Sequence, residues 1–63
     1  MPKMMWVAKA KTKLNKYLGD YSGEYAESLY TTYVEEDPDK LYADDPDSAV
    51  DEDMSYLGLT YND

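Results

Sequence analysis

Residues 23–36, GEYAESLYTTYVEE, carry the clearest pattern in the chain and decide its fold class. Their apolar and aromatic side chains recur three or four residues apart, which is the spacing of one helix face. These side chains belong to Tyr25, Ala26, Leu29, Tyr30, Tyr33 and Val34. Polar residues fill most other positions, and Glu24 and Glu27 suit the positive N-terminal end of a helix. The segment therefore predicts an amphipathic helix.

Two Asp-Pro pairs follow this segment, Asp37-Pro38 and Asp45-Pro46, and each begins a D-P-D triplet. The residue before a proline disfavours helical backbone angles, so the first pair is expected to end the preceding helix. The same arrangement favours a new helix, with Asp as its N-cap and Pro at its first position. We therefore expect a short helix from residue 38 to about residue 43 and a longer one over residues 46–57.

The N-terminal segment, residues 3–18, also favours a helix. Its apolar stripe has helical spacing and consists of Trp6, Ala10, Leu14, Tyr17 and Leu18. A strand is the competing interpretation, because Trp6, Ala8 and Ala10 alternate with other residues at the period of a strand. Ala and Lys prefer helices, and the segment exceeds the usual strand length, so we expect a helix.

These segments predict an all-α fold, a small three- to four-helix domain that spans residues 1–63 and has a strongly acidic face. The expected core consists of Trp6, Leu14, Leu18, Leu29, Tyr33 and Val34. Residues 19–23 are typical of a turn, in which Asp20 or Ser22 caps the next helix. We expect Gly58 to follow the last helix and the tail, residues 59–63, to be frayed apart from Leu59.

The supply of core-forming residues is small. Leu, Ile, Val and Phe together make nine of the 63 residues, and there is no Cys or His for a disulfide or a zinc site. A chain of this length buries only about 60% of the surface that its unfolded form exposes. Eight Tyr, four Met and Trp6 partly compensate for the missing aliphatic residues. We expect a marginally stable domain that folds weakly alone, forms a homodimer or relies on another partner.

The composition argues against catalysis and against a bound cofactor. Without His and Cys, the common nucleophile–base pairs cannot form, so we expect no enzymatic activity and no cofactor. Asp-rich segments suit hard cations such as calcium. The EF-hand spacing fails, however, because counting from Asp45 puts Ala49 at a ligand position and Val50 at the glycine position. We therefore expect no dedicated metal site.

Charge is distributed unevenly along the chain. Residues 1–18 contain five Lys and no acid, whereas residues 19–63 contain fourteen acids and one Lys. The basic segment has the composition of a membrane-surface or nucleic-acid-binding helix, but the acidic remainder would be repelled by any anionic surface. We expect no membrane association and no direct binding of nucleic acid. No signal peptide or spanning segment is recognisable, so a cytoplasmic location is expected, that of the host if the protein is viral.

The candidate functional segment is Glu35–Asp53, EEDPDKLYADDPDSAVDED, in which ten of nineteen residues are acidic and only Lys40 is basic. Carboxylates three or four positions apart on a helix stand about 5–6 Å apart, which is close to the spacing of nucleic-acid phosphates. Tyrosines among them offer the flat contact typical of interfaces. This composition resembles that of phage-encoded DNA-mimic inhibitors, which block restriction, CRISPR or repair proteins. The resemblance implies a basic, nucleic-acid-binding protein as the partner.

The candidate contact residues are nine acids and two tyrosines: Glu35, Glu36, Asp37, Asp39, Asp44, Asp45, Asp47, Asp51, Glu52, Tyr30 and Tyr42. Two hypotheses remain open. In the first, these residues bind and occlude a basic surface of another protein. In the second, the chain is a structural or accessory subunit that becomes ordered within a larger assembly, for which the small core argues. Salt dependence separates them, because only the first kind of binding depends strongly on charge.

Overall fold

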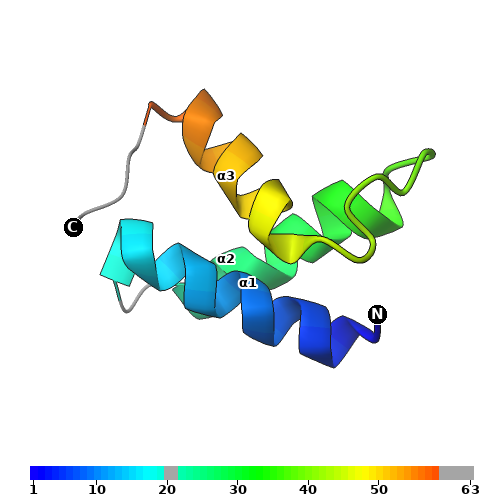
Figure 1. Ribbon diagram of the computed structural model, residues 1–63, viewed down its shortest axis with the longest axis horizontal. Helices are drawn as coiled ribbons and strands as arrows, with labels where there is room; N and C mark the ends of the chain where they lie inside the picture. Colours follow the sequence, from blue (N-terminus) through cyan, green and yellow to red (C-terminus); the bar gives the residue numbers. More distant parts are fainter. Residues whose placement is uncertain (20–21, 59–63) are drawn as a thin grey trace.

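The computed structural model describes residues 1–19 and 22–58, and its regular segments are helical (Figure 1). Helix α1 (Lys3–Leu18) is followed by α2 (Ser22–Tyr30), which continues directly into a π-helical turn, η2 (Thr31–Glu35). Helix α3 (Pro46–Tyr56) completes the three helices. The described residues contain no strand, so the all-α class is confirmed and the strand interpretation of residues 3–18 is excluded. Of the two expected caps, Asp20 lies outside the described residues and Ser22 is the first residue of α2. The expected tail, residues 59–63, also lies outside the described residues.

Helix α1 exists because its apolar residues have helical spacing and a surface to pack against. Trp6, Ala10 and Leu14 lie four positions apart and are all fully buried. Gly19 follows the helix with a φ of 69°, and its N–H donates to the carbonyl of Asn15. Glycine adopts this positive φ without the steric cost that a side chain would add, so it ends the helix cleanly.

Helix α2 and η2 together form the segment predicted at residues 23–36, and their inner face contributes Ala26, Leu29 and Val34 to the core. The π-helical turn is defined by the bond from the N–H of Glu36 to the carbonyl of Thr31, at 2.9 Å. Such a turn leaves main-chain carbonyls without a helical partner at its end. The ammonium group of Lys40 donates to two of them, those of Val34 and Glu35.

Helix α3 begins as the second Asp-Pro pair predicted. A side-chain oxygen of Asp45 accepts from the N–H of Ser48 at 3.2 Å, and Pro46 occupies the first turn. This cap satisfies one of the N–H groups that a helix start leaves without an internal acceptor. The inner face then places Ala49, Val50 and Met54 fully inside the core. The helix ends one residue earlier than predicted, at Tyr56, and Gly58 follows with a φ of 74°.

The prediction of a short helix over residues 38–43 is wrong. Residues 37–45 form successive tight turns, in which N–H groups bond to carbonyls three residues earlier. One such bond joins Lys40 to Asp37 at 3.3 Å, and another joins Asp45 to Tyr42 at 3.1 Å. Lys40 has a φ of 53°, which lies in the left-handed region and cannot continue a right-handed helix. The strain of this conformation is opposed by the two bonds of the Lys40 ammonium group.

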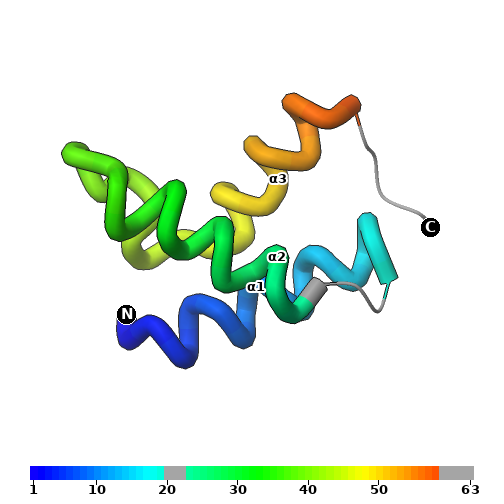
Figure 2. Tube along the Cα trace, turned by 180° about the vertical axis from the view of Figure 1, so that it is seen from behind, coloured from blue at the N-terminus to red at the C-terminus, as the bar shows by residue number. Residues whose placement is uncertain are grey.

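The helices pack around one apolar cluster with Trp6 at its centre. Helix α1 packs against both α2 and α3, and Figures 1 and 2 show the C-terminal end of α3 (orange) rising away from α1. The ring of Trp6 meets that of Tyr30 edge-on, with centroids 5.3 Å apart. Of the six predicted core residues, four are buried: Trp6, Leu14, Leu29 and Val34. Leu18 and Tyr33 are half-buried and pack against the cluster.

No helix within the described residues is both long enough and apolar enough to cross a membrane.

Candidate functional site

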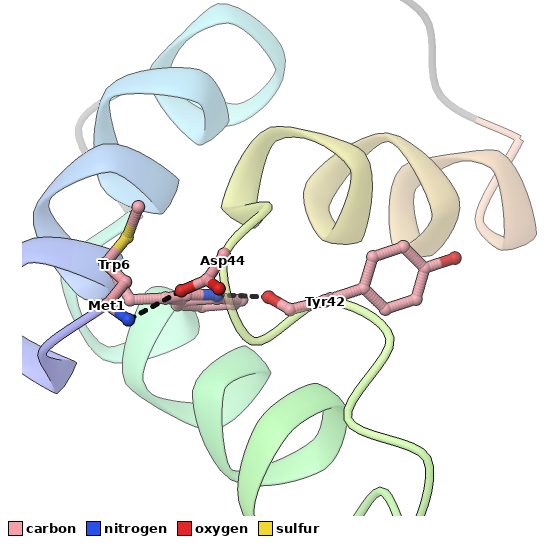
Figure 3. Close-up of polar contacts among 4 residues, drawn as sticks. All are labelled: Met1, Trp6, Tyr42 and Asp44. Atoms are coloured by element: carbon pink, nitrogen blue, oxygen red, sulfur yellow. Dashed lines mark hydrogen bonds and ion pairs between the residues drawn. The ribbon is translucent and has the colours of Figure 1, made fainter.

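The turn segment, residues 37–45, is held against α1 at two points (Figure 3). The indole N–H of Trp6 donates to the main-chain oxygen of Tyr42 at 2.6 Å. The α-ammonium group of Met1 forms an ion pair with the carboxylate of Asp44, also at 2.6 Å. Because Trp6 is fully buried, its bond to Tyr42 ties the turn segment to the centre of the core.

This docking places Tyr42 beside the start of α3. Figure 3 shows the main-chain oxygen of Tyr42 directed at Trp6 and its ring directed away. The half-buried Tyr42 ring packs edge-on against Tyr33, with centroids 5.5 Å apart. A shallow groove opens next to it, which we call the Tyr42 groove. Its lining residues are Tyr42, Asp45, Ser48, Asp51, Glu52 and Ser55.

The structure brings together three of the predicted acids in the Tyr42 groove, namely Asp45, Asp51 and Glu52. They meet because Asp51 and Glu52 lie one helical turn beyond Ser48 on the same side of α3. Asp45 is also the cap of the helix, and Asp51 accepts from the hydroxyl of Tyr17 at 2.8 Å and lies 3.6 Å from the ammonium of Lys13. Glu52 is exposed. Of the three, Glu52 is therefore the acid that contributes least to the fold.

Other predicted contact acids also have structural roles. Asp37 is half-buried, and its side chain accepts from the N–H of Leu41 at 3.1 Å. Asp44 holds the α-ammonium group of Met1, although its side chain is 79% exposed. Glu35 accepts a long bond, 3.4 Å, from the hydroxyl of Thr31. These carboxylates stabilise turns and ends of the fold, so their presence in the sequence does not by itself indicate a binding surface.

Three predicted acids are exposed, and within the described residues their side chains form no hydrogen bond or ion pair: Glu36, Asp39 and Asp47. They are not gathered at one point. Glu36 lies at the end of η2, Asp39 in the turn segment and Asp47 in the first turn of α3. Asp47 lines a second shallow groove between α1 and α3, together with Lys9, Lys13 and Lys16. Its charge is therefore partly opposed by lysines.

Tyr30, the other predicted contact tyrosine, lies away from the Tyr42 groove. It is half-buried against Trp6, and the ammonium group of Lys3 lies 5.4 Å from its ring centre. A cation above an aromatic face is attracted by the ring quadrupole. The ring is thus engaged within the chain by both Trp6 and Lys3.

Asp53 of α3 is half-buried and accepts hydrogen bonds from two tyrosine hydroxyls. Tyr25 donates to one of its oxygens, and Tyr33 donates to the other at 3.2 Å. Burial, and then the hydrogen bond to Asp53, raises the pKa of Tyr25 to about 12. Burial and the charge of Asp53 also raise the pKa of Tyr33. The cluster joins α2 and η2 to α3 through neutral hydroxyl donors.

Ser48 and Ser55 in the Tyr42 groove were not among the predicted contact residues. The signal that identifies them is the helical spacing from Ser48 through Asp51 and Glu52 to Ser55, which marks one polar face of α3. Among the residues that the structure describes, no group of three or more Asp or Glu side chains could hold a metal ion.

Compared with known proteins, the chain matches no family model, no curated protein and no solved structure.

Proposed function

We propose that this protein binds a basic surface of a nucleic-acid-binding protein and occludes it. The observation that carries the proposal is the Tyr42 groove, which combines an aromatic ring with three carboxylates. A guanidinium or ammonium group in this groove would meet opposite charge from Asp45, Asp51 and Glu52, and the Tyr42 ring would supply apolar contact for the aliphatic part of the same side chain. The chemistry of the groove therefore fits an Arg or Lys side chain of the partner.

The charge balance around the groove supports the same proposal. Residues 19–63 contain fourteen acids and one lysine, and that lysine, Lys40, donates to main-chain carbonyls at the end of η2. Its charge is thus directed at the helix end, and it is not among the lining residues of the groove. A negative field of this kind speeds association with a basic partner and suppresses binding to acidic ones.

A binding experiment with matched variants tests the proposal. The immobilised protein is incubated with host lysate at low salt, eluted with rising salt, and each captured protein is then measured alone. Asp45→Asn with Glu52→Gln removes two charges of the Tyr42 groove and keeps a side chain that can cap α3, whereas Glu24→Gln with Glu27→Gln removes two charges on α2. We expect the first pair to weaken binding about tenfold or more, chiefly through slower association, and the second to have little effect.

Competition identifies the class of partner. If the acidic surface mimics nucleic acid, saturating duplex DNA or single-stranded RNA displaces the protein from its partner. A complex that survives both competitors, or affinity within about threefold for the Asp45→Asn, Glu52→Gln pair at low salt, contradicts the proposal, because charge would then contribute little.

A second candidate function is that of an accessory subunit within a larger assembly, and exposed apolar residues favour it. Met4 is 84% exposed and Leu41 is 71% exposed. In that case the apolar positions carry the contact, and binding is insensitive to salt. Replacing Met4 and Leu41 with Ser would then abolish binding, while the Asp45→Asn, Glu52→Gln pair would leave it intact.

A further inference from the structure

The outward side of α1 presents apolar residues between lysines. Met4 and Met5 are 84% and 52% exposed, and Ala8 continues the stripe one turn further along. Lys9 lies on one flank of the stripe and Lys11 on the other, and both are exposed. We call these five residues the α1 outer face. A helix surface of this kind is complementary to an apolar surface bordered by acids.

The chain itself carries such a surface at the end of α3. Tyr56, the last residue of α3, is 80% exposed. Glu52 lies one turn before Tyr56 on the same side of the helix and is also exposed. We call Glu52 and Tyr56 the α3 outer face. It pairs aromatic area with negative charge.

We propose that the α1 outer face of one molecule docks on the α3 outer face of a second copy of this chain, in a head-to-tail contact. The charges of the two faces favour this arrangement over a symmetric contact. A symmetric contact between two α1 outer faces would oppose Lys9 and Lys11 with the same lysines of the second copy. A symmetric contact between two α3 outer faces would oppose like carboxylates. Only the mixed contact joins opposite charges while it buries methionine against tyrosine.

The positions of the two faces determine the kind of assembly. Figures 1 and 2 show the C-terminal end of α3 (orange) directed away from α1, so one copy offers both faces at once. A contact between two different faces extends into a ring or an open chain, whereas a symmetric contact stops at a dimer. The whole molecule exposes 4284 Å², and a contact of standard size would bury about 800 Å² of it on each partner. Each face consists of a few side chains on one helix, so we expect a smaller contact and weak association that grows with concentration.

Two variants remove one face each with little expected cost to folding. Met4→Glu with Ala8→Glu places charge on the α1 outer face, and both sites are exposed helix positions that accept Glu well. Glu52→Gln with Tyr56→Ser removes charge and aromatic area from the α3 outer face. The control, Ser28→Glu with Thr32→Glu, adds two charges at exposed positions on the outward side of α2 and η2. Circular dichroism of each variant checks that the helices are retained.

Sedimentation velocity over a range from low micromolar to millimolar protein, at about 0.15 M salt to screen the net repulsion, provides the measurement. We expect the wild type and the control to sediment faster as concentration rises. Each face variant alone is expected to stay monomeric or to associate at least about tenfold more weakly. The decisive sample is an equimolar mixture of the two face variants. It restores one intact pair of faces, because one variant keeps its α3 outer face and the other keeps its α1 outer face, so the mixture forms a one-to-one dimer and grows no further.

Three outcomes would overturn the inference. A wild type that remains monomeric at every concentration shows that a second copy does not occupy these faces. Association that is lost in only one variant, or that the mixture fails to restore, indicates a symmetric contact. Binding of the wild-type monomer to vesicles of anionic lipid, with loss in the Met4→Glu, Ala8→Glu variant, assigns the α1 outer face to a membrane surface instead. The inference does not depend on the proposed function, since none of these measurements involves the basic partner.

Discussion

The triplets Asp37-Pro38-Asp39 and Asp45-Pro46-Asp47 have the same sequence, yet only the second one starts a helix. Both aspartates accept a nearby main-chain N–H, Asp37 from Leu41 at 3.1 Å and Asp45 from Ser48 at 3.2 Å. The aspartate of each triplet therefore forms a hydrogen bond of the capping kind. What differs is the burial of the residues that follow.

After the second triplet, Ala49 and Val50 enter the core and are fully buried. After the first, Leu41 is 71% exposed, and the carbonyl of Tyr42 is bonded to Trp6. A helix of one or two turns gains too little from its own hydrogen bonds to be stable without tertiary packing. The comparison teaches that a capping motif permits a helix, whereas core contacts decide whether it forms.

The largest effect is expected from removing core contacts of α3. Met54→Ala is expected to lower the free energy of unfolding by about 2–5 kcal/mol, because Met54 is fully buried. Leu41→Ala, the control in the exposed turn segment, should change it by no more than about 0.5 kcal/mol. Urea denaturation followed by circular dichroism measures both. If Leu41→Ala costs as much as Met54→Ala, the Leu41 side chain packs on the core and the comparison fails.

The bond between Trp6 and the turn segment is expected to have the next largest effect. Trp6→Phe keeps an aromatic ring in the core but leaves the carbonyl of Tyr42 without its donor, which should cost about 1–3 kcal/mol in addition to the change in packing. Tyr42→Phe is the matched control, since it keeps the main-chain acceptor. Equal stabilities of the two variants in thermal unfolding would show that the indole N–H contributes nothing.

Removing the two capping aspartates compares the triplets directly. Asp45→Ala should cost about 0.5–2 kcal/mol, because it removes a helix N-cap. Asp37→Ala should cost less, since the turn that it supports starts no helix. Hydrogen exchange of the first amides of α3 should accelerate only in Asp45→Ala. A larger loss in Asp37→Ala would mean that the turn segment, rather than α3, limits stability.

The smallest effect at neutral pH comes from the tyrosines bonded to Asp53, and it becomes visible only in alkali. The pKa of Tyr25 is raised from 10.0 to about 12 in the folded protein. A raised folded pKa means that the stabilisation is complete below the unfolded value and is lost as pH rises through the folded one. The thermal midpoint should therefore fall from about pH 10 upward, and less steeply in Tyr25→Phe. A midpoint that is constant up to pH 12 would contradict the Asp53 cluster.

Much of the fold could be predicted because helical period and burial coincide. The stripe of Trp6, Ala10 and Leu14 has the period of a helix and is fully buried, and Asp45-Pro46 marks the start of α3 correctly. The turn segment could not be predicted, because it depends on the left-handed conformation of Lys40 and on a bond to Trp6 from a distant part of the chain. Neither the left-handed conformation nor the bond to Trp6 can be recognised from the sequence of the neighbouring residues.

The candidate site was less predictable than the fold, because carboxylates serve several purposes that a sequence does not distinguish. Asp44 and Asp51 looked like surface acids, and the structure shows each of them bonded to the N-terminal helix region. Conversely, Asp53 lies close to the apolar side of α3, where a charged group is unfavourable, and hydrogen bonds from two tyrosine hydroxyls stabilise it there. The partner of a polar group can be known only when distant segments are placed together.

The position of Trp6 gives the protein a built-in optical reporter. It is the sole tryptophan of the chain, so its fluorescence reports one location only. That location is where α1, Tyr30 and the carbonyl of Tyr42 meet, so the emission senses whether the turn segment is closed over the core. Helicity measured by circular dichroism senses α1, α2 and α3 together. If fluorescence changes at a lower temperature than helicity, the turn segment opens as a separate unit before the helices come apart.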